Sequence, residues 1–143
     1  MPKTSNSDYR ALAAFRYEVR KFLAFSEQAA RNAGIEPQQH QLLLAVRGLP
    51  EGSRPTIGAI AERLCVQHHT VVALVDKVEA AGFLVRVRAE KDRREVLLQL
   101  TLEGESMLAG LSVLHREQLR NVGPEMVAAL GKIVEANGQG KQG

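Results

Sequence analysis

The segment from Thr56 to Thr101 constrains the fold most, because it holds two short helical patterns separated by only three residues. Apolar residues recur at helical spacing up to Leu64, after Thr56 as a suitable N-cap. A second helical pattern ends before Gly82, where a left-handed C-terminal cap is expected. Since residues 65–67 have room only for a sharp turn, the segment predicts a helix-turn-helix.

Two runs of alternating apolar and polar residues, Phe83 to Arg88 and Val96 to Leu100, follow the second helix and predict a β-hairpin. Between residues 86 and 94 the chain carries five basic side chains and two acidic ones. The connecting segment, 89–95, offers no evident apolar anchor. We therefore expect a charged wing that protrudes beside the helix-turn-helix.

The N-terminal part of the chain predicts one long helix, 8–34, with Asp8 as its N-cap. Its apolar stripe includes Leu12, Phe15 and Val19. A helix of this length is difficult to cover with the rest of a 143-residue chain, which favours packing against a second copy. Packing within the core of one chain is the alternative. A shorter buried helix is expected to begin at Pro37.

The C-terminal part predicts two further helices. Thr101 is expected to cap the first, and Gly104 stands where a capping box needs glutamate, so the start of that helix is expected to fray. Gly123-Pro124 is expected to end it after about residue 121. A last helix then runs to about residue 136, with an apolar stripe that includes Leu130, Ile133 and Val134. The glycine-rich tail, 137–143, is expected to be disordered.

Together these patterns predict a single domain that is mainly α with a small β-hairpin wing. A winged helix-turn-helix, 37–101, would be flanked by terminal helices at 8–34 and 102–136. No apolar run is long enough to span a membrane and no secretory leader is recognisable, so a cytoplasmic protein is expected. One cysteine excludes an internal disulfide, and a net charge of +3 is too small to indicate nucleic acid without the clustering on the wing.

This order of elements resembles the MarR family of winged helix-turn-helix regulators, from residue 8 to residue 136. The resemblance is carried by Leu74 to Glu79, by Gly82 to Val85 and above all by Asp92-Arg93-Arg94 followed by Leu98-Gln99-Leu100-Thr101. Two positions depart from the family pattern: Cys65 stands where the turn often has glycine, and Ala73 stands where many relatives have a long polar residue.

The resemblance implies a ligand-responsive repressor that binds a pseudo-palindromic operator in double-stranded DNA as a homodimer. Its terminal helices would interlock with those of a second copy and contribute the dimer contacts of Leu12, Phe15, Val19, Leu130, Ile133 and Val134. A small-molecule effector would bind between the DNA-reading lobe and the dimer helices, where Arg16, Arg20 and His40 are candidates for contacting it.

The second helix of a helix-turn-helix enters the major groove with its first turns facing the base edges. The residues in those turns are Gln67, His68, His69, Thr70 and Ala73. Glutamine and histidine can hydrogen-bond to base edges, and a threonine methyl or an alanine can contact a thymine methyl. Gln67 and Thr70 could instead cap the helix. Lys77, two turns further on, is expected to contact phosphate or to remain solvated.

On the wing, Arg94 is expected to enter the minor groove, with Asp92 accepting from its guanidinium and fixing its direction. Arg88, Lys91 and Arg93 would add sequence-independent attraction to phosphates. A solvated hairpin tip without DNA contacts is the alternative.

Other classes of function find less support in the sequence. His68 and His69 are adjacent, so their side chains diverge on a helix, and neither a metal site nor a cofactor is expected. No catalytic motif is present, which argues against an enzyme. Cys65, in the turn between two helices, is expected to be a small buried residue rather than an oxidant sensor. The remaining rival is a winged-helix module that binds protein without specific DNA binding.

Overall fold

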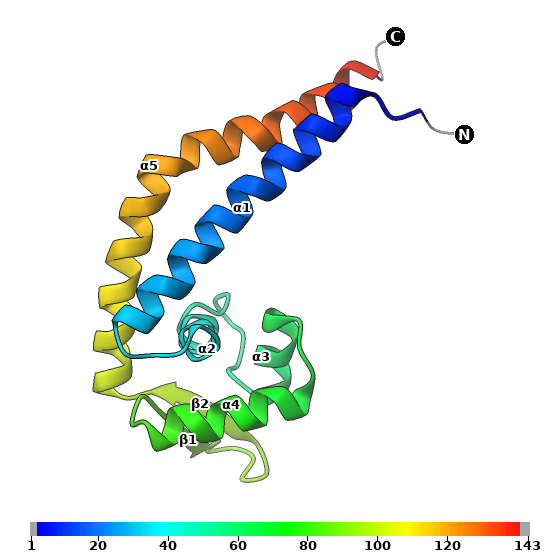
Figure 1. Cartoon of the computed structure of the whole chain (residues 1–143). Helices are drawn as coiled ribbons and strands as arrows, with labels where there is room; N and C mark the ends of the chain where they lie inside the picture. The colour runs from blue at the N-terminus through cyan, green and yellow to red at the C-terminus, as the bar shows by residue number, and fades with distance from the viewer. Residues whose placement is uncertain (1–2, 141–143) are drawn as a thin grey trace. The chain divides into compact units, whose positions relative to one another are not determined.

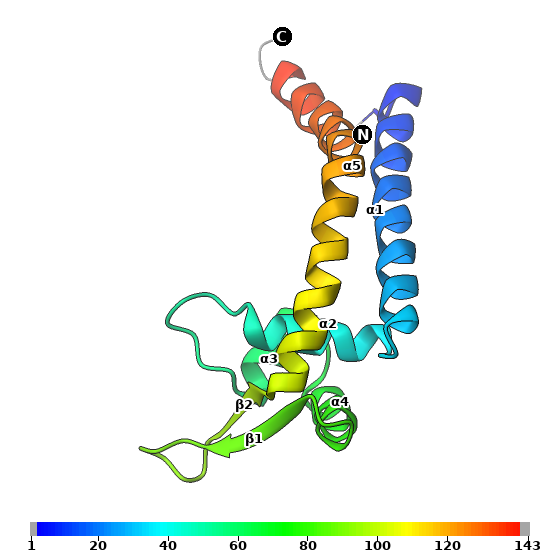
Figure 2. The ribbon, with the colours of Figure 1, turned by 90° about the vertical axis from the view of Figure 1, so that its left-hand side faces the viewer.

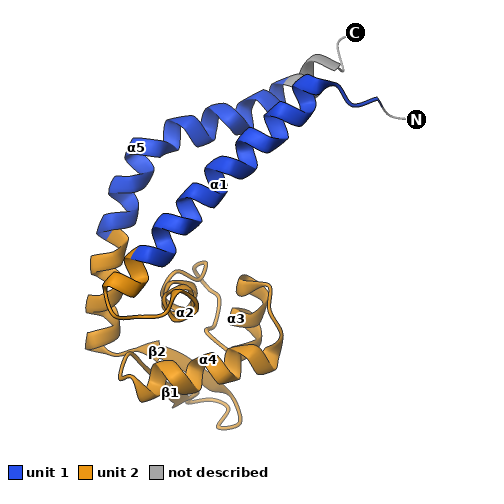
Figure 3. Ribbon diagram, viewed as in Figure 1, with its two compact units in different colours: residues 1–28, 113–143 blue, residues 29–112 orange. Residues whose placement is uncertain are grey.

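The computed structural model describes residues 3–140, and their side chains as far as residue 135. Its elements are α1 (Asn6–Asn32), α2 (Pro37–Arg47), α3 (Ile57–Leu64), α4 (His68–Ala80), β1 (Leu84–Arg88), β2 (Val96–Leu100) and α5 (Leu102–Gly140), shown in Figure 1. This order confirms the predicted fold class. Two compact units divide the chain, unit 1 with residues 1–28 and 113–143 and unit 2 with residues 29–112 (Figure 3). No helix within the described residues is long and apolar enough to cross a membrane.

Unit 2 contains the helix-turn-helix and the hairpin around one apolar core. The Thr56 hydroxyl accepts a hydrogen bond from the Ala59 N–H at 3.1 Å and caps α3, as predicted. Gly82 has the positive φ of 88° expected just beyond α4. The core is formed by the fully buried side chains of Leu42, Leu43, Ile60, Val71, Val75, Val78, Leu84 and Leu98.

The hairpin is antiparallel, and Leu84 pairs with Leu100 at its base. The apolar residues of β1 that alternate with its arginines, Val85 and Val87, are each 39% exposed, whereas Leu84 is fully buried. The face of β1 that turns toward the core therefore carries Leu84 and the half-buried Arg86. The loop also has the apolar anchor that the sequence did not reveal, because Ala89 is only 4% exposed.

The start of α5 is ordered by a cap, so the prediction that it frays was wrong. The Thr101 hydroxyl accepts from the Gly104 N–H at 3.0 Å and donates to the Gly82 carbonyl at 2.6 Å. The Thr101 N–H donates to the Phe83 carbonyl at 3.1 Å. Position 104 holds glycine in place of the glutamate of a capping box because a Cβ there would overlap the Phe83 carbonyl oxygen. The hairpin base and the first turn of α5 are thus joined through backbone contacts.

The predicted break at Gly123-Pro124 was also wrong, because α5 is one helix that passes through Pro124. A proline removes one N–H donor and crowds the carbonyl four residues earlier, and this commonly bends a helix without ending it. Figure 1 shows such a change of direction in the gold-to-orange part of α5, within unit 1. Beyond the proline, Glu125 lies 3.8 Å from Lys21 of α1, and Ala129 is buried. The helix reaches Gly140, and residues 141–143 of the predicted disordered tail lie outside the described residues.

In unit 1, α1 and α5 (Figure 2) meet at a polar pair formed by Ser26 and His115. Ser26, which is 6% exposed, has its hydroxyl 2.7 Å from the Nε2 atom of His115. The rings of Phe22 and Phe25 lie edge-on to the His115 ring, with centroids at 5.9 and 5.7 Å. The hydrogen bond to the half-buried His115 offsets the cost of burying the Ser26 hydroxyl.

The cap of α1 is Ser5 and not the predicted Asp8. The helix begins at Asn6, which puts Asp8 in its first turn. Ser5 and Asp8 hydrogen-bond to each other in both directions. The Asp8 carboxylate accepts from the Ser5 N–H at 2.9 Å and from its hydroxyl at 3.0 Å, while the Asp8 N–H donates to the Ser5 Oγ atom at 3.1 Å. This arrangement is a capping box with aspartate in the third helical position. The bond from the Ser5 N–H, then that from its hydroxyl, hold the pKa of Asp8 below its ordinary value.

This capping box gives the N-terminus of α1 a pH dependence. A carboxyl group whose pKa is lowered in the folded state stabilises it above the unfolded pKa, and the stabilisation is lost as pH falls through the folded value. We expect the Ser5 amide resonance to shift in acid, with a midpoint below the ordinary aspartate pKa of about 3.9. In Asp8→Asn, which keeps an acceptor oxygen but does not titrate, the shift should vanish. An identical shift in both proteins would contradict the assignment.

Candidate nucleic-acid interface

The exposed side of α4 carries the residues predicted to read bases. Its other side is buried in unit 2 through Val71, Leu74, Val75 and Val78. Gln67 occupies the N-cap position, and its side chain forms no capping bond. The capping alternative is therefore not realised for Gln67. The remaining candidates lie on the solvent side of α4. Thr70 is half-buried, and the others are exposed: His68, His69, Ala73 and Lys77.

The turn before α4 is left-handed at a residue that is not glycine. Cys65 caps the C-terminus of α3 with φ 56° and ψ 42°, and the Val66 N–H donates to the Ala61 carbonyl at 3.1 Å. The expectation of a buried Cys65 was wrong, because its side chain is exposed. The structure thus explains why glycine suits this position: residues with a Cβ are strained there.

Replacing Cys65 with glycine should therefore stabilise unit 2. Relief of the left-handed strain is worth about 1 kcal/mol, partly offset by the greater freedom that glycine has in the unfolded chain. Denaturant-induced unfolding should give a higher midpoint for Cys65→Gly than for the parent protein. Cys65→Ser, which keeps the Cβ, provides the matched control and should leave the midpoint unchanged. A lower midpoint for the glycine variant would show that the turn is not left-handed in solution.

The wing tip is a tight turn from Asp92 to Glu95. The Glu95 N–H donates to the Asp92 carbonyl at 3.0 Å, and the Arg94 N–H donates to the Asp92 Oδ1 atom at 3.0 Å. The Arg94 Nε atom lies 3.7 Å from the same Oδ1 atom, and its side chain is 96% exposed. Asp92 therefore fixes the backbone of the turn more directly than the Arg94 guanidinium. That guanidinium projects into solvent, available to a partner.

The other cations of the wing differ in what they contact. The Arg88 Nη1 atom donates to the Arg93 carbonyl at 2.6 Å and so braces the tip across the loop. Lys91 and Arg93 are exposed. Glu95, the last residue before β2, forms an ion pair with Arg54, whose Nη1 atom lies 3.0 Å from its Oε2 atom. Both views of the ribbon place α4 and the hairpin loop at the lower end of unit 2 (Figures 1 and 2).

An ion-pair cluster between α4 and β1 was not anticipated from the sequence. Arg86 donates to Asp76 and to Glu79, each at 2.6 Å. The bond to Asp76, and after it the bond to Glu79, raise the pKa of Arg86 above its ordinary value. The available signal was the spacing of Asp76 and Glu79, three residues apart on the solvent side of α4, together with an arginine in the strand that follows.

The candidate residues for effector binding lie in different units. Arg16 and Arg20 are exposed on α1 in unit 1. His40 is 2% exposed in unit 2, with its Nδ1 atom 3.4 Å from the Gln41 amide nitrogen. Within the part of the chain that is described, no three His, Cys, Asp or Glu residues lie close enough to hold a metal ion.

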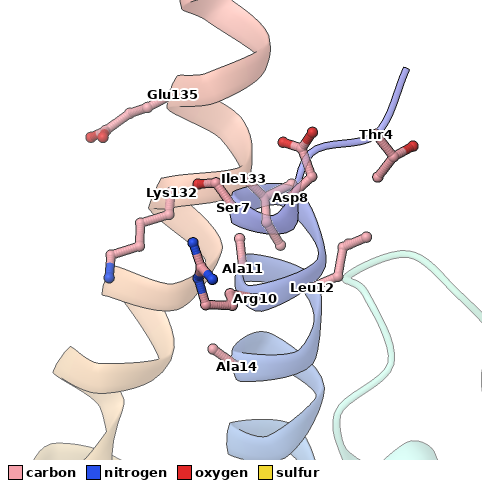
Figure 4. Close-up of a pocket in the computed structure, with 10 residues that line it drawn as sticks. All are labelled: Thr4, Ser7, Asp8, Arg10, Ala11, Leu12, Ala14, Lys132, Ile133 and Glu135. Atoms are coloured by element: carbon pink, nitrogen blue, oxygen red, sulfur yellow. The ribbon is translucent and has the colours of Figure 1, made fainter. Parts of the chain in front are cut away.

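Unit 1 has an open groove of about 580 Å³ between the N-terminal turns of α1 and the C-terminal part of α5 (Figure 4). Its lining includes Asp8, Arg10, Ala11, Leu12, Lys132 and Ile133. Of the residues predicted to contact a second copy, Leu12, Leu130 and Val134 are 48%, 46% and 62% exposed. Phe15, Val19 and Ile133 are half-buried. Val127 is 70% exposed and extends this apolar surface along α5.

Comparison with known proteins gives consistent matches. Residues 33–95 match the model of the MarR family. YkoM of Bacillus subtilis, an HTH-type transcriptional regulator, is 32% identical over 111 residues, which cover 74% of this chain and 69% of YkoM. A MarR family protein from Bacillus stearothermophilus shares the fold with a TM-score of 0.74 at 20% identity, over 99% of this chain and 100% of that one. A mutant of Staphylococcus aureus MepR bound to an oligodeoxyribonucleotide superposes with a TM-score of 0.64 at 18% identity, over 98% and 97% of the chains.

Proposed function

Because the chain belongs to the MarR family of transcriptional regulators, we propose that it binds a pseudo-palindromic operator as a homodimer and represses transcription until a small effector acts on it. As a member of this family it is a DNA-binding regulator rather than an enzyme. It would act in the cytoplasm, where bacterial operators lie. One observation carries the proposal: an exposed recognition helix and an exposed wing-tip arginine lie in the same compact unit. The MepR mutant that shares this fold was solved bound to an oligodeoxyribonucleotide.

In the proposed complex α4 enters the major groove. Gln67 and His68 reach base edges from the first turn, since their side chains are exposed and Gln67 forms no capping bond. His69, Thr70 and Ala73 add contacts along the same exposed side. Lys77, further along the helix, contacts phosphate.

The wing supplies the minor-groove contact. Arg94 enters the minor groove where A·T-rich sequence narrows it and deepens its negative potential. Asp92 supports this role by fixing the turn that carries Arg94. Lys91 and Arg93 attract phosphates, and Arg88 does so while it braces the tip.

The homodimer is supported by apolar surface on the terminal helices. Val127, Leu130 and Val134 follow one another on α5 and are exposed, as is Leu12 on α1. Contiguous exposed apolar residues of this kind mark an interaction surface, and a second copy of the chain would bury them by twofold symmetry. Sedimentation at micromolar concentration should give the mass of two chains. The mass of one chain would remove the dimer from the proposal.

The rival function is a winged-helix module that binds another protein. The two functions differ in their response to salt, because contacts with phosphates release counterions from DNA. For about six or more phosphate contacts, affinity for duplex DNA should fall by about a thousandfold or more between about 50 and 200 mM salt. A filter-binding titration at the two salt concentrations measures this. Weak binding that does not change with salt would favour the rival.

A further inference from the structure

We propose that Arg86 is a positioning residue for DNA binding, which holds the wing in a fixed orientation on α4 so that Arg94 and the first turns of α4 reach one duplex together. This inference rests on the proposed function, because it assumes that both elements contact DNA. Arg86 itself would contact no DNA. Its guanidinium is occupied by two carboxylates of the recognition helix.

The contacts of Arg86 use its side chain and its backbone together. The Nη2 atom donates to the Asp76 Oδ1 atom and the Nη1 atom to the Glu79 Oε1 atom, each at 2.6 Å. The second oxygen of Glu79 accepts from the Arg86 backbone N–H at 3.1 Å, at the outer edge of β1. The Glu79 carboxylate thus accepts hydrogen bonds from both the backbone N–H at the edge of β1 and the guanidinium. Only the planar fork of an arginine can pair with both acidic residues in this way.

The hairpin needs such a contact to keep its orientation. A two-stranded hairpin is marginally stable by itself, and its twist varies more than that of a larger sheet. Arg86 pairs across the strands with Leu98, whose N–H donates at 2.9 Å to the Pro55 carbonyl on the opposite edge. At this one residue pair, both edges of the hairpin are therefore held by contacts with neighbouring segments. The Arg86 cluster is the fixing point on the side of α4.

The same cluster removes unfavourable charge from the recognition helix. Asp76 and Glu79 flank Lys77 on α4, and their side chains are 64% and 38% exposed. Unpaired carboxylates there would repel phosphates. The two possible roles of the Glu79 carboxylate predict opposite effects of one substitution. Glu79→Gln should tighten DNA binding if only the negative charge matters, and weaken it if the carboxylate orients the wing through Arg86.

The test measures affinity in a double-mutant cycle with Arg94→Ala. The probe is a duplex of about 30 base pairs that the wild-type protein selects from a random-sequence library, long enough for two half-sites one helical turn apart. Arg86→Lys keeps the charge and loses the fork, and Glu79→Gln keeps an acceptor for the strand N–H and loses the ion pair. We expect each to weaken binding about tenfold in the wild-type background, and less than about twofold when Arg94 is already alanine.

The controls separate this proposal from its premise and from a loss of folding. Arg47→Lys changes an exposed ion pair with Glu105 elsewhere in unit 2 and should leave affinity unchanged in both backgrounds. Circular dichroism checks that each variant is folded, and Glu79→Gln carries the test if Arg86→Lys is not. Equal losses in both backgrounds, or tighter binding by Glu79→Gln, would overturn the positioning role. If Arg94→Ala alone has no effect on binding, the wing contact of the proposed function fails instead.

Discussion

Alanine at position 104 is expected to destabilise unit 2 by at least about 3 kcal/mol, although alanine favours a helix more than glycine does. A Cβ at this position would overlap the Phe83 carbonyl oxygen and lie 2.9 Å from the carbonyl carbon. These are backbone atoms, and they are held in place because the Phe83 carbonyl accepts from the Thr101 N–H. Neither side can therefore move away at low cost. The free energy of unfolding, measured with denaturant, should fall accordingly.

Gly110 provides the matched control in the same helix. A Cβ there would have no atom within 4 Å, so Gly110→Ala should show only the gain in helix propensity. That gain is about 0.5 to 1 kcal/mol, of opposite sign to the effect at position 104. If both substitutions stabilise the protein, the first turn of α5 does not pack against the base of the hairpin.

Removal of the Arg94 side chain is expected to weaken operator binding by about 10- to 100-fold without changing stability. The side chain is 96% exposed, and its guanidinium lies 3.7 Å from the nearest carboxylate atom, so the fold loses almost nothing. The Asp92 cap of the turn remains, because it accepts from the Arg94 backbone N–H. The loss should be largest on operators with A·T-rich sequence beside the half-sites, where the minor groove is narrow.

Arg47→Ala is the charge-matched control for this result. It removes one positive charge from unit 2 at an ion pair that belongs to neither α4 nor the wing. Affinity should then change by no more than about twofold, as expected for a distant exposed charge at moderate ionic strength. Equal losses from the two substitutions would mean that Arg94 contributes only net charge and does not enter the groove.

Local patterns predicted the helix-turn-helix and hairpin well because local interactions decide these elements. Thr56 caps α3, and Gly82 follows α4 with a positive φ, as their positions in the sequence indicated. The continuous α5 was missed for the opposite reason. The preference of Pro124 to end a helix is local and does not by itself decide whether the helix continues, and α5 runs on beyond it, with Glu125 3.8 Å from Lys21, a residue about a hundred positions away in the chain.

The candidate site was predicted less completely than the fold. The exposed positions of α4 follow directly from helical periodicity. The alternation in β1 suggested no partner for Arg86, because it does not show which face of a hairpin meets a helix; the apolar Val85 and Val87 proved to be the exposed pair. In the same way, the sequence suggested that Arg88 attracts phosphate and did not show that it also holds the Arg93 carbonyl. Contacts of this kind require the register and the path of the loop.

The central claim is that one exposed helix and one cationic wing read DNA together, twice, in a symmetric dimer. The most direct test is a hydroxyl-radical footprint on genomic fragments that the purified protein retains from its own organism. We expect two protected half-sites related by twofold symmetry, with centres about one helical turn or a multiple of it apart, and loss of both in the double variant His68→Ala, Arg94→Ala. Retention of no fragment above bulk DNA, or a footprint that the double variant leaves intact, would contradict the account.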